Sequence, residues 1–128
     1  MKDMEEAPAA EAERAGDVLD STSLHELRQL EVDGAEGLVA QLFGSFLNQA
    51  GTELAALRSA LRSGDVALTG DVSHRLRGTA ATLGATGVVR VCEDLEAAAA
   101  SDHLALYGSL LERLESELVR VARVVDAL

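Results

Sequence analysis

Apolar residues near the C-terminal end of the chain recur at a spacing that strongly restricts the fold. Between residues 104 and 128 they alternate steps of three and four positions, and they are Leu104, Tyr107, Leu111, Leu114, Leu118, Val121, Val125 and Leu128. Because an α-helix has about 3.6 residues per turn, this spacing gathers the apolar residues into one stripe along a helix. Such a stripe needs another surface to cover it, so the segment predicts helix-on-helix packing.

Four earlier segments carry weaker forms of the same spacing, and they are residues 20–32, 35–62, 65–83 and 88–100. Residues typical of helix ends separate the long segments, namely Ser63-Gly64-Asp65, Gly84 and Ser101-Asp102. Short connections make neighbouring helices antiparallel. We therefore predict an all-α protein, an antiparallel up-down-up-down four-helix bundle with residues 20–32 as a short accessory N-terminal helix. A coiled-coil oligomer would show similar spacing, but the turns favour a chain that folds back on itself.

The composition agrees with one helical domain. The chain has 128 residues, of which 48% are hydrophobic, and most of these are Ala, Leu and Val. This length is enough for one core, and such residues suit helix packing better than a sheet. Residues 1–16 are rich in Ala and Glu and contain the single proline, Pro8, so they offer little burial to offset the entropy of ordering. We expect an acidic flexible tail over residues 1–16 and a helical domain over residues 17–128.

Charge and cysteine content argue against several classes of ligand and setting. The formal net charge of -11 argues against nucleic acid, because binding a phosphate backbone requires clustered Lys and Arg. No apolar run approaches the roughly 20 residues of a membrane span, so we expect no membrane partner. Cys92 stands alone and no basic signal peptide opens the chain, which favours a cytoplasmic protein without disulfides. No pattern of metal-ligand spacing occurs, so we expect no bound metal or cofactor.

Segment 65–83 contains His74 on the side away from its apolar residues. At about 100° per residue, one face of this helix carries Leu68, Val72, Leu76 and Leu83. The opposite face carries His74, Arg77, Gly78 and Ala81. We therefore expect the imidazole to face outward, toward a partner.

These residue types suit transfer of a phosphoryl group. A neutral imidazole nitrogen is nucleophilic near neutral pH, so histidine can accept a phosphoryl group without a separate activating base. Arg77, at i+3, would oppose the charge of the phosphate, and Arg75 would add to the positive field. Gly78, at i+4, would leave room for the in-line approach of the donor. An interior glycine costs a helix about 1 kcal/mol, and close helix packing is the alternative reason to keep it.

Two motifs in register resemble the histidine-containing phosphotransfer (HPt) domain. The first is Ser73-His74-Arg75-Leu76-Arg77-Gly78-Thr79 with Leu83-Gly84-Ala85 after it, and the second is Cys92-Glu93-Asp94-Leu95-Glu96. They are similar to the family's His-x-Leu-Lys-Gly, Gly-Ala and Cys-x-x-Leu-Glu patterns. The resemblance extends over about residues 24–128, because the segment Phe46-Leu47-Asn48-Gln49-Ala50 and the Ser-Gly-Asp turn also fit.

The resemblance implies a role for each matching residue. His74 would be the phosphorylated residue, Arg77 would take the place of the usual lysine, and Gly78 would be the small residue below the ring. Gln49 falls where some members place a glutamine that hydrogen-bonds the imidazole. Glu96 occupies a site where other members carry glutamine, which leaves a contact between Glu96 and His74 open.

The resemblance also implies a function. The chain would accept a phosphoryl group on His74 from an aspartate of a response-regulator receiver domain and pass it to another receiver. The receivers would bring the Mg²⁺ and much of the catalytic machinery, and a hybrid histidine kinase is a further candidate partner. Nothing in the sequence resembles an ATP-binding kinase domain, so we expect a monomeric phosphocarrier that is not an enzyme by itself.

Two other functions remain open at this point. A helical adaptor that is not phosphorylated could bind a receiver or another signalling protein through the same bundle. Leu24-His25-Glu26-Leu27-Arg28 resembles the phosphorylation box of sensor histidine kinases and would predict a two-chain scaffold, but the proline of that motif is absent. We expect His25 and His103 to be surface residues and Cys92 to be a small buried hydrophobic residue.

Overall fold

The computed structural model describes residues 18–128 of the chain. Its helices are α2 (Ser21–Val32), α3 (Leu38–Ser63), α4 (Val66–Leu83), α5 (Thr86–Ala100) and α6 (Tyr107–Asp126), and a short 3₁₀ helix, η1 (Leu104–Leu106), precedes α6. No strand occurs in the described part, so the all-α prediction is confirmed. The predicted tail over residues 1–16 lies outside the described residues.

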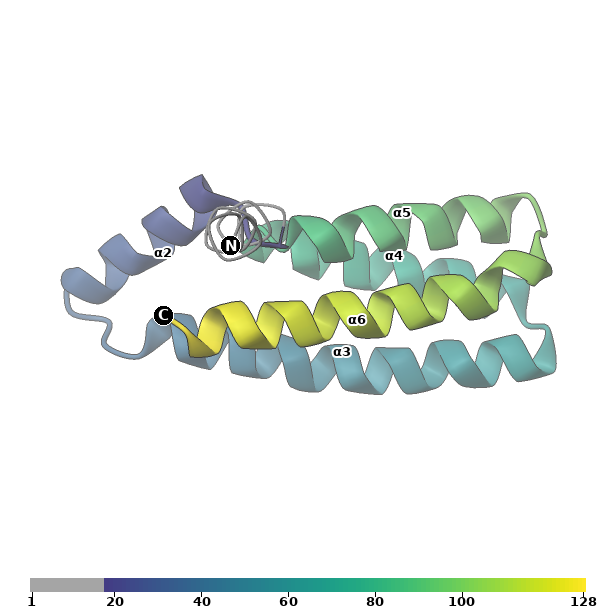
Figure 1. Ribbon diagram of the computed structural model, residues 1–128, viewed down its shortest axis with the longest axis horizontal. Helices are drawn as coiled ribbons and strands as arrows, with labels where there is room; N and C mark the ends of the chain where they lie inside the picture. Colours follow the sequence, from purple (N-terminus) through teal and green to yellow (C-terminus); the bar gives the residue numbers. More distant parts are fainter. Residues whose placement is uncertain (1–17) are drawn as a thin grey trace, which may run out of the picture.

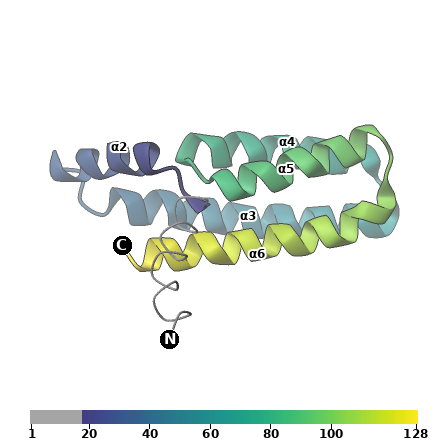
Figure 2. The same ribbon diagram turned by 45° about the horizontal axis from the view of Figure 1, so that its top comes forward.

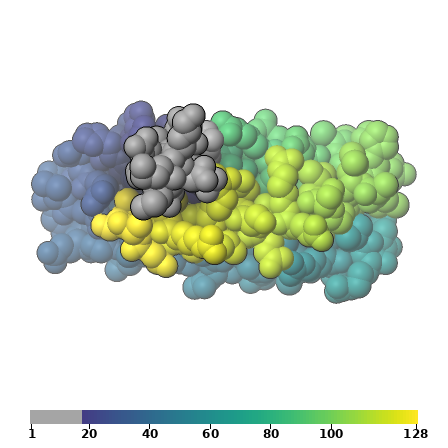
Figure 3. Space-filling view, viewed as in Figure 1, coloured from purple at the N-terminus to yellow at the C-terminus, as the bar shows by residue number. Residues whose placement is uncertain are grey.

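The four long helices form an antiparallel bundle. Along the chain they run up, down, up and down, and α2 leaves the end of the bundle at an angle (Figures 1 and 2). Each long helix packs against two others, because α3 contacts α4 and α6, while α5 contacts α4 and α6. Side chains of α6 fill the front face between its two neighbours (Figure 3). The predicted bundle with a short N-terminal helix is therefore confirmed.

One core runs through the bundle, and every long helix contributes to it. Its fully buried large side chains include Phe43 and Leu57 of α3, Leu76 of α4, Leu95 of α5 and Leu114 of α6. Burying a side chain of this size contributes about 1.5–3 kcal/mol, so the apolar stripes hold the helices together. Val18 and Leu19, which belong to none of the periodic segments, are 1% and 3% exposed and lie in this core.

The apolar stripe of α6 is buried over its middle. Tyr107, Leu111, Leu114, Leu118 and Val121 are buried. The stripe fails at both ends of the segment, where Leu104 and Leu128 are 42% and 47% exposed. Leu104 lies in η1 before the helix begins, and Leu128 lies beyond its last residue, so neither belongs to the buried stripe of α6.

Two glycines with left-handed backbone end α3 and α4, as the sequence predicted. Gly64 has φ of 70° and Gly84 has φ of 72°. Gly84 is required for a second reason, because a Cβ atom there would lie 2.7 Å from Cβ of Ser23. The carbonyl oxygen of Gly84 accepts a hydrogen bond from the backbone N–H of Asp20, and the carboxylate of Asp20 caps α2 through Ser23. The turn between α4 and α5 therefore anchors the start of α2.

The buried face of α4 differs from the predicted one at one position. Thr69, Val72, Leu76, Ala80 and Leu83 are buried together with Ser73. Leu68 was expected in this stripe but is 38% exposed. Steps of three and four lead back from Leu76 and Val72 to Thr69, so Thr69 faces the core and Leu68 lies at its edge. The correction leaves the opposite, outward face of α4 as predicted.

Candidate functional site

The imidazole of His74 lies on the outward face of α4. Its side chain is 70% exposed, whereas Ser73 just before it and Leu76 two positions after it are buried. The buried residues fix the rotation of α4 against the core, so the ring cannot turn inward without exposing them. The structure therefore places His74 where another protein can reach it.

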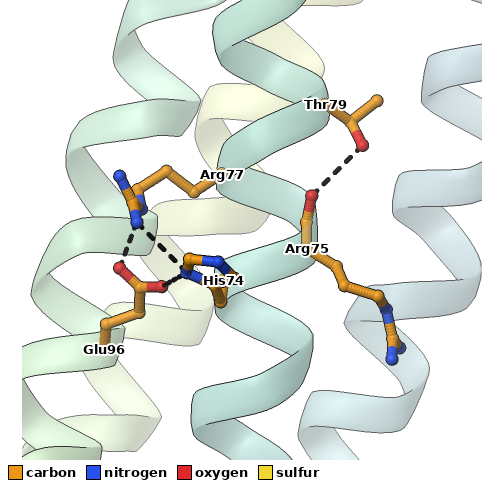
Figure 4. Close-up of polar contacts among 5 residues, drawn as sticks. All are labelled: His74, Arg75, Arg77, Thr79 and Glu96. Atoms are coloured by element: carbon orange, nitrogen blue, oxygen red, sulfur yellow. Dashed lines mark hydrogen bonds and ion pairs between the residues drawn. The ribbon is translucent and has the colours of Figure 1, made fainter.

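Two side chains lie beside one nitrogen of this ring. Nδ1 of His74 lies 2.8 Å from Oε1 of Glu96, which belongs to α5. The other oxygen of Glu96 lies 2.8 Å from Nε of Arg77, and Nη2 of Arg77 lies 3.1 Å from Nδ1 of His74. Figure 4 shows the three side chains closing a triangle between α4 and α5. This His74–Arg77–Glu96 cluster joins two neighbouring helices.

The contacts of Nδ1 determine which nitrogen is free to react. A carboxylate only accepts hydrogen bonds, whereas a guanidinium only donates them, so Nδ1 can satisfy one of the two at a time. The contact with Glu96 is the shorter one, and it joins the ring to a charged acceptor. We therefore assign the proton to Nδ1, which leaves a lone pair on Nε2. No residue between 18 and 128 hydrogen-bonds Nε2.

The structure does not bring Gln49 to the imidazole. Gln49 lies on α3, and its amide nitrogen donates to Oε1 of Glu53 over 3.0 Å. The helix α4 separates this pair from the side on which His74 meets Glu96, so the partner of the imidazole comes from α5 instead. The hydrogen bond that the resemblance implied for Gln49 is thus made by Glu96.

Arg75 also lies apart from the imidazole. Its guanidinium donates to Oε2 of Glu53 over 3.2 Å, on the side of α4 that faces α3. Figure 4 shows the side chain of Arg75 directed away from His74. Successive helix residues are about 100° apart and do not face each other, which explains the separation. Arg75 therefore contributes less to the field at His74 than the sequence suggested.

Gly78 is exposed, and packing among residues 18–128 does not explain it. A Cβ atom at this position would meet nothing within 4 Å. Ala81 is exposed one turn further along the same face. The alternative reason for the glycine, close helix packing, is therefore excluded, and the open surface beside His74 is left for another molecule.

A groove between α3 and α4 begins beside this surface. Its lining residues are Leu42, Ser45, Phe46, Gln49, Arg75, Gly78, Thr79, Thr82 and Leu83. The hydroxyls of Thr79 and Thr82 donate to backbone carbonyls of their own helix, over 3.1 Å and 3.0 Å. Because each hydroxyl uses its donor within α4, these threonines offer the groove methyl groups and hydroxyl acceptors but no free donor. We call this surface the α3–α4 groove, and it is largely apolar with one cation at its edge.

The other candidate residues lie away from the His74 cluster. His25 is exposed on α2, and His103 is exposed beside Ser101 at the opposite end of the chain's long helices. Cys92 is fully buried, and burial raises the pKa of its thiol to about 12, so it remains protonated near neutral pH. Over residues 18–128, no three His, Cys, Asp or Glu side chains are grouped to hold a metal ion.

Two acidic residues complete the site, and sequence reasoning had not assigned either of them. For Glu96 a signal existed: an arginine replaces the family's lysine and a carboxylate replaces its glutamine, and the two changes are complementary in charge. Glu53 falls among the buried residues of α3, between Ala50 and Leu57, where a charged residue is unusual. Each glutamate proves to be the partner of one arginine from α4.

No helix within residues 18–128 is both long and apolar enough to span a membrane. The model of the Hpt domain family matches residues 41–124, which include His74, Arg77, Gly78 and Glu96. The crystal structure of histidine-containing phosphotransfer protein B (HptB) from Pseudomonas aeruginosa PAO1 superimposes with a TM-score of 0.74 at 24% sequence identity. That match covers 85% of this chain and 91% of the other. No curated protein shows significant similarity to the sequence. Because the family match spans more than half of the sequence, the chain belongs to the Hpt family of histidine phosphotransfer domains.

Proposed function

We propose that His74 is the residue through which this chain relays phosphoryl groups. As a member of the Hpt family, the chain is a histidine phosphotransfer relay intermediate. Hpt proteins are carriers without a kinase domain, and their partners are response-regulator receiver domains. The observation that supports His74 is an exposed ring whose Nδ1 is held by Glu96 while Nε2 makes no hydrogen bond within residues 18–128.

The chemistry follows from the state of the two ring nitrogens. The lone pair of Nε2 attacks the phosphorus of an aspartyl phosphate on the receiver, and a P–N bond forms. The P–O bond to the aspartate breaks, and its electron pair returns to the carboxylate. The proton stays on Nδ1, so the phosphorylated ring gains positive charge that the carboxylate of Glu96 stabilises. Attack by an aspartate of a second receiver reverses these steps. We assign the Mg²⁺ of the transfer to the receiver and none to this chain.

Arg77 balances the negative charge that the phosphoryl group brings to His74. A phosphoryl group brings between one and a half and two negative charges near pH 7. Guanidinium has five N–H donors, and with the proton on Nδ1 of His74 only Nε of Arg77 is engaged, by Glu96, so both terminal nitrogens remain for phosphoryl oxygens. Gly78 and Ala81 leave the space through which the donor aspartate approaches in line with Nε2.

The chain offers matched controls for the test of this assignment. His74→Gln should abolish labelling by a phosphorylated receiver, because glutamine has no nucleophilic nitrogen of this kind, and should leave the helical circular dichroism intact. His25→Gln and His103→Gln should be labelled as fully as the parent chain. The label should be acid-labile and base-stable. Persistent labelling of His74→Gln would refute the assignment, and no labelling of any form would favour the adaptor that is not phosphorylated.

We further propose that the carrier works as a cytoplasmic monomer and exchanges phosphoryl groups with two receivers, one of which can belong to a hybrid histidine kinase. The single, deeply buried Cys92 is compatible with a reducing compartment. Sedimentation of the full chain should give the mass of one copy. A stable two-copy particle would instead support the scaffold centred on His25.

A further inference from the structure

Glu53 is the charged residue that is buried among residues 18–128. Its side chain is 9% exposed, and both of its carboxylate oxygens have partners. Oε1 accepts a hydrogen bond from the amide of Gln49, and Oε2 accepts one from the guanidinium of Arg75. The mechanism at His74 uses none of these three side chains.

Stability gives a poor account of this buried carboxylate. Removing a carboxylate from water is costly, and an apolar residue of similar volume often serves a buried position at least as well. The neighbours of Glu53 on the inner face of α3 are apolar, namely Ala50, Leu54 and Leu57. What Glu53 does achieve is to fix an arginine whose side chain remains 63% exposed.

Arg75 lies on the surface that a docked receiver would cover. A protein that brings an aspartate to Nε2 of His74 also covers the surface around it, because a standard interface occupies about 800 Å² on each partner. Arg75 is the next residue after His74 and lines the α3–α4 groove. Of the apolar lining residues, Leu42 is partly exposed, whereas Phe46 and Leu83 form the floor of the groove at 3% and 8% exposure.

We propose that Arg75, positioned by Glu53, selects the receiver: it pairs with a carboxylate that the receiver presents beside an apolar helix seated in the α3–α4 groove. This inference rests on the proposed function and adds the chemistry of the partner. An apolar groove with one cation at its edge complements an apolar helix flanked by an acidic side chain. A receiver with a basic residue at that place meets like charge and is rejected.

Pairing with the buried Glu53 lets Arg75 bind a carboxylate of the receiver at a lower cost in entropy. An arginine free in solvent loses rotamer entropy when it pairs, and one already held in place loses less. Gln49 supports the arrangement because it occupies the carboxylate oxygen that Arg75 leaves free. Glu53 is therefore a positioning residue, and Arg75 is the residue that touches the partner.

The chain provides a close control for Arg75. Arg58 also pairs with a glutamate of another helix, Glu115 of α6, and its side chain is 46% exposed. It lies on the side of α3 that meets α6, away from the α3–α4 groove. Both arginines are replaced by glutamate, and phosphotransfer from the receiver that labels His74 is followed at increasing receiver concentration.

Arg75→Glu should raise the receiver concentration for half-maximal rate about tenfold and leave the maximal rate within about twofold. Arg58→Glu should change neither value. Equal behaviour of the two variants would overturn the proposal. A lower maximal rate with an unchanged half-saturation point would also overturn it, because Arg75 would then act on the phosphoryl step.

Glu53→Gln separates positioning from folding. It should raise the half-saturation concentration about threefold in the parent chain and have no effect in an Arg75→Gln background, because the residue acts through Arg75. An equal effect in both backgrounds would mean that Glu53 only supports the fold. Titration of the unphosphorylated receiver gives an independent reading: His74→Gln should bind with the parent affinity, whereas Arg75→Glu should bind more weakly. Failure of the phosphoacceptor assignment and failure of the docking proposal are thereby distinguished.

Discussion

Each of two sides of α4 carries an arginine that pairs with a glutamate of a neighbouring helix, and the two pairs have different surroundings. On the α5 side Arg77 meets Glu96, and on the α3 side Arg75 meets Glu53. The arginines are two positions apart, so they point about 200° away from each other around the helix. Glu96 is 24% exposed and also contacts the imidazole, whereas Glu53 is nearly buried and contacts an amide.

On our proposals, helix position rather than residue type decides what an arginine–glutamate pair does. The α5 pair touches the ring that we propose as the phosphoryl acceptor, so it should affect the chemical step. The α3 pair touches the α3–α4 groove, so it should affect which partner docks. Variants of one pair should therefore change the maximal rate of transfer, and variants of the other should change its dependence on receiver concentration.

The largest effect is expected at Glu96. Glu96→Ala removes the acceptor that holds the proton on Nδ1, and the maximal transfer rate should fall about 10- to 100-fold. Glu96→Gln keeps an uncharged acceptor, so the maximal transfer rate of this variant should fall less. Single-turnover transfer at saturating receiver measures the rate, and ¹⁵N chemical shifts of His74 report the tautomer. A similar loss in Glu53→Gln would remove the distinction between the two pairs.

A smaller effect is expected at Arg77. Arg77→Ala should slow transfer or shorten the lifetime of the phosphohistidine about tenfold, since a charge-assisted hydrogen bond contributes about 1.5–3 kcal/mol and this one is partly exposed. Arg77→Lys keeps the charge and should stay within about threefold. The lifetime is followed in the absence of receiver, with Arg75→Ala as the control. A shorter lifetime in that control would show that both arginines serve the phosphate.

Variants of Gly78 test whether the open surface of α4 beside His74 is needed for receiver docking. Gly78→Ala should raise the free energy of unfolding by up to about 1 kcal/mol, because the added Cβ meets nothing within 4 Å and a helical glycine is costly. Gly78→Gln should hinder receiver docking more than folding. Thermal unfolding and transfer are measured side by side, with the same changes at Gly51, an exposed glycine of α3 with equal space, as the control. Normal transfer by Gly78→Gln would remove the steric role of the glycine.

The smallest effect near neutral pH concerns Cys92, which lies one turn before Glu96 in α5. Burial first, and the charge of Glu96 second, raise the pKa of its thiol from 9.0 to about 12. The unfolded chain therefore releases this proton at lower pH than the folded one. The protonated thiol therefore contributes to the free energy of unfolding. This contribution is intact below pH 9 and is lost between about pH 9 and 12, at up to about 1.4 kcal/mol per pH unit. Urea unfolding of the parent chain and of Cys92→Ala should show a steeper loss of stability in the parent, because the raised pKa of Tyr107 affects both chains equally.

Much of the fold followed from spacing and turn residues, because both act within one segment. Steps of three and four identified the four long helices, and Gly64 and Gly84 marked their ends. The start of α6 was placed too early, since Leu104 continues the stripe but lies in η1. Val18 and Leu19 were passed over because two apolar residues have no measurable period, although contacts with the rest of the chain bury them.

The site was predictable only to the extent that it lies on one helix. The angle per residue placed His74, Arg77 and Gly78 on one face of α4 without knowledge of the other helices. Which residue of α5 or α3 lies opposite depends on how the helices cross, and spacing within a segment does not determine that. Glu96 was therefore left open, Glu53 was not considered, and Gln49 was assigned to a ring from which α4 separates it.

Both receivers would react at the same nitrogen, Nε2 of His74, so they cannot bind at the same time. A donor that has transferred its phosphoryl group has to dissociate before an acceptor can bind. Kinetics should follow a ping-pong scheme in which surplus spent donor competes with the acceptor. The ratio of the two receivers in the cell, more than any property of the carrier, would then control how fast the signal moves.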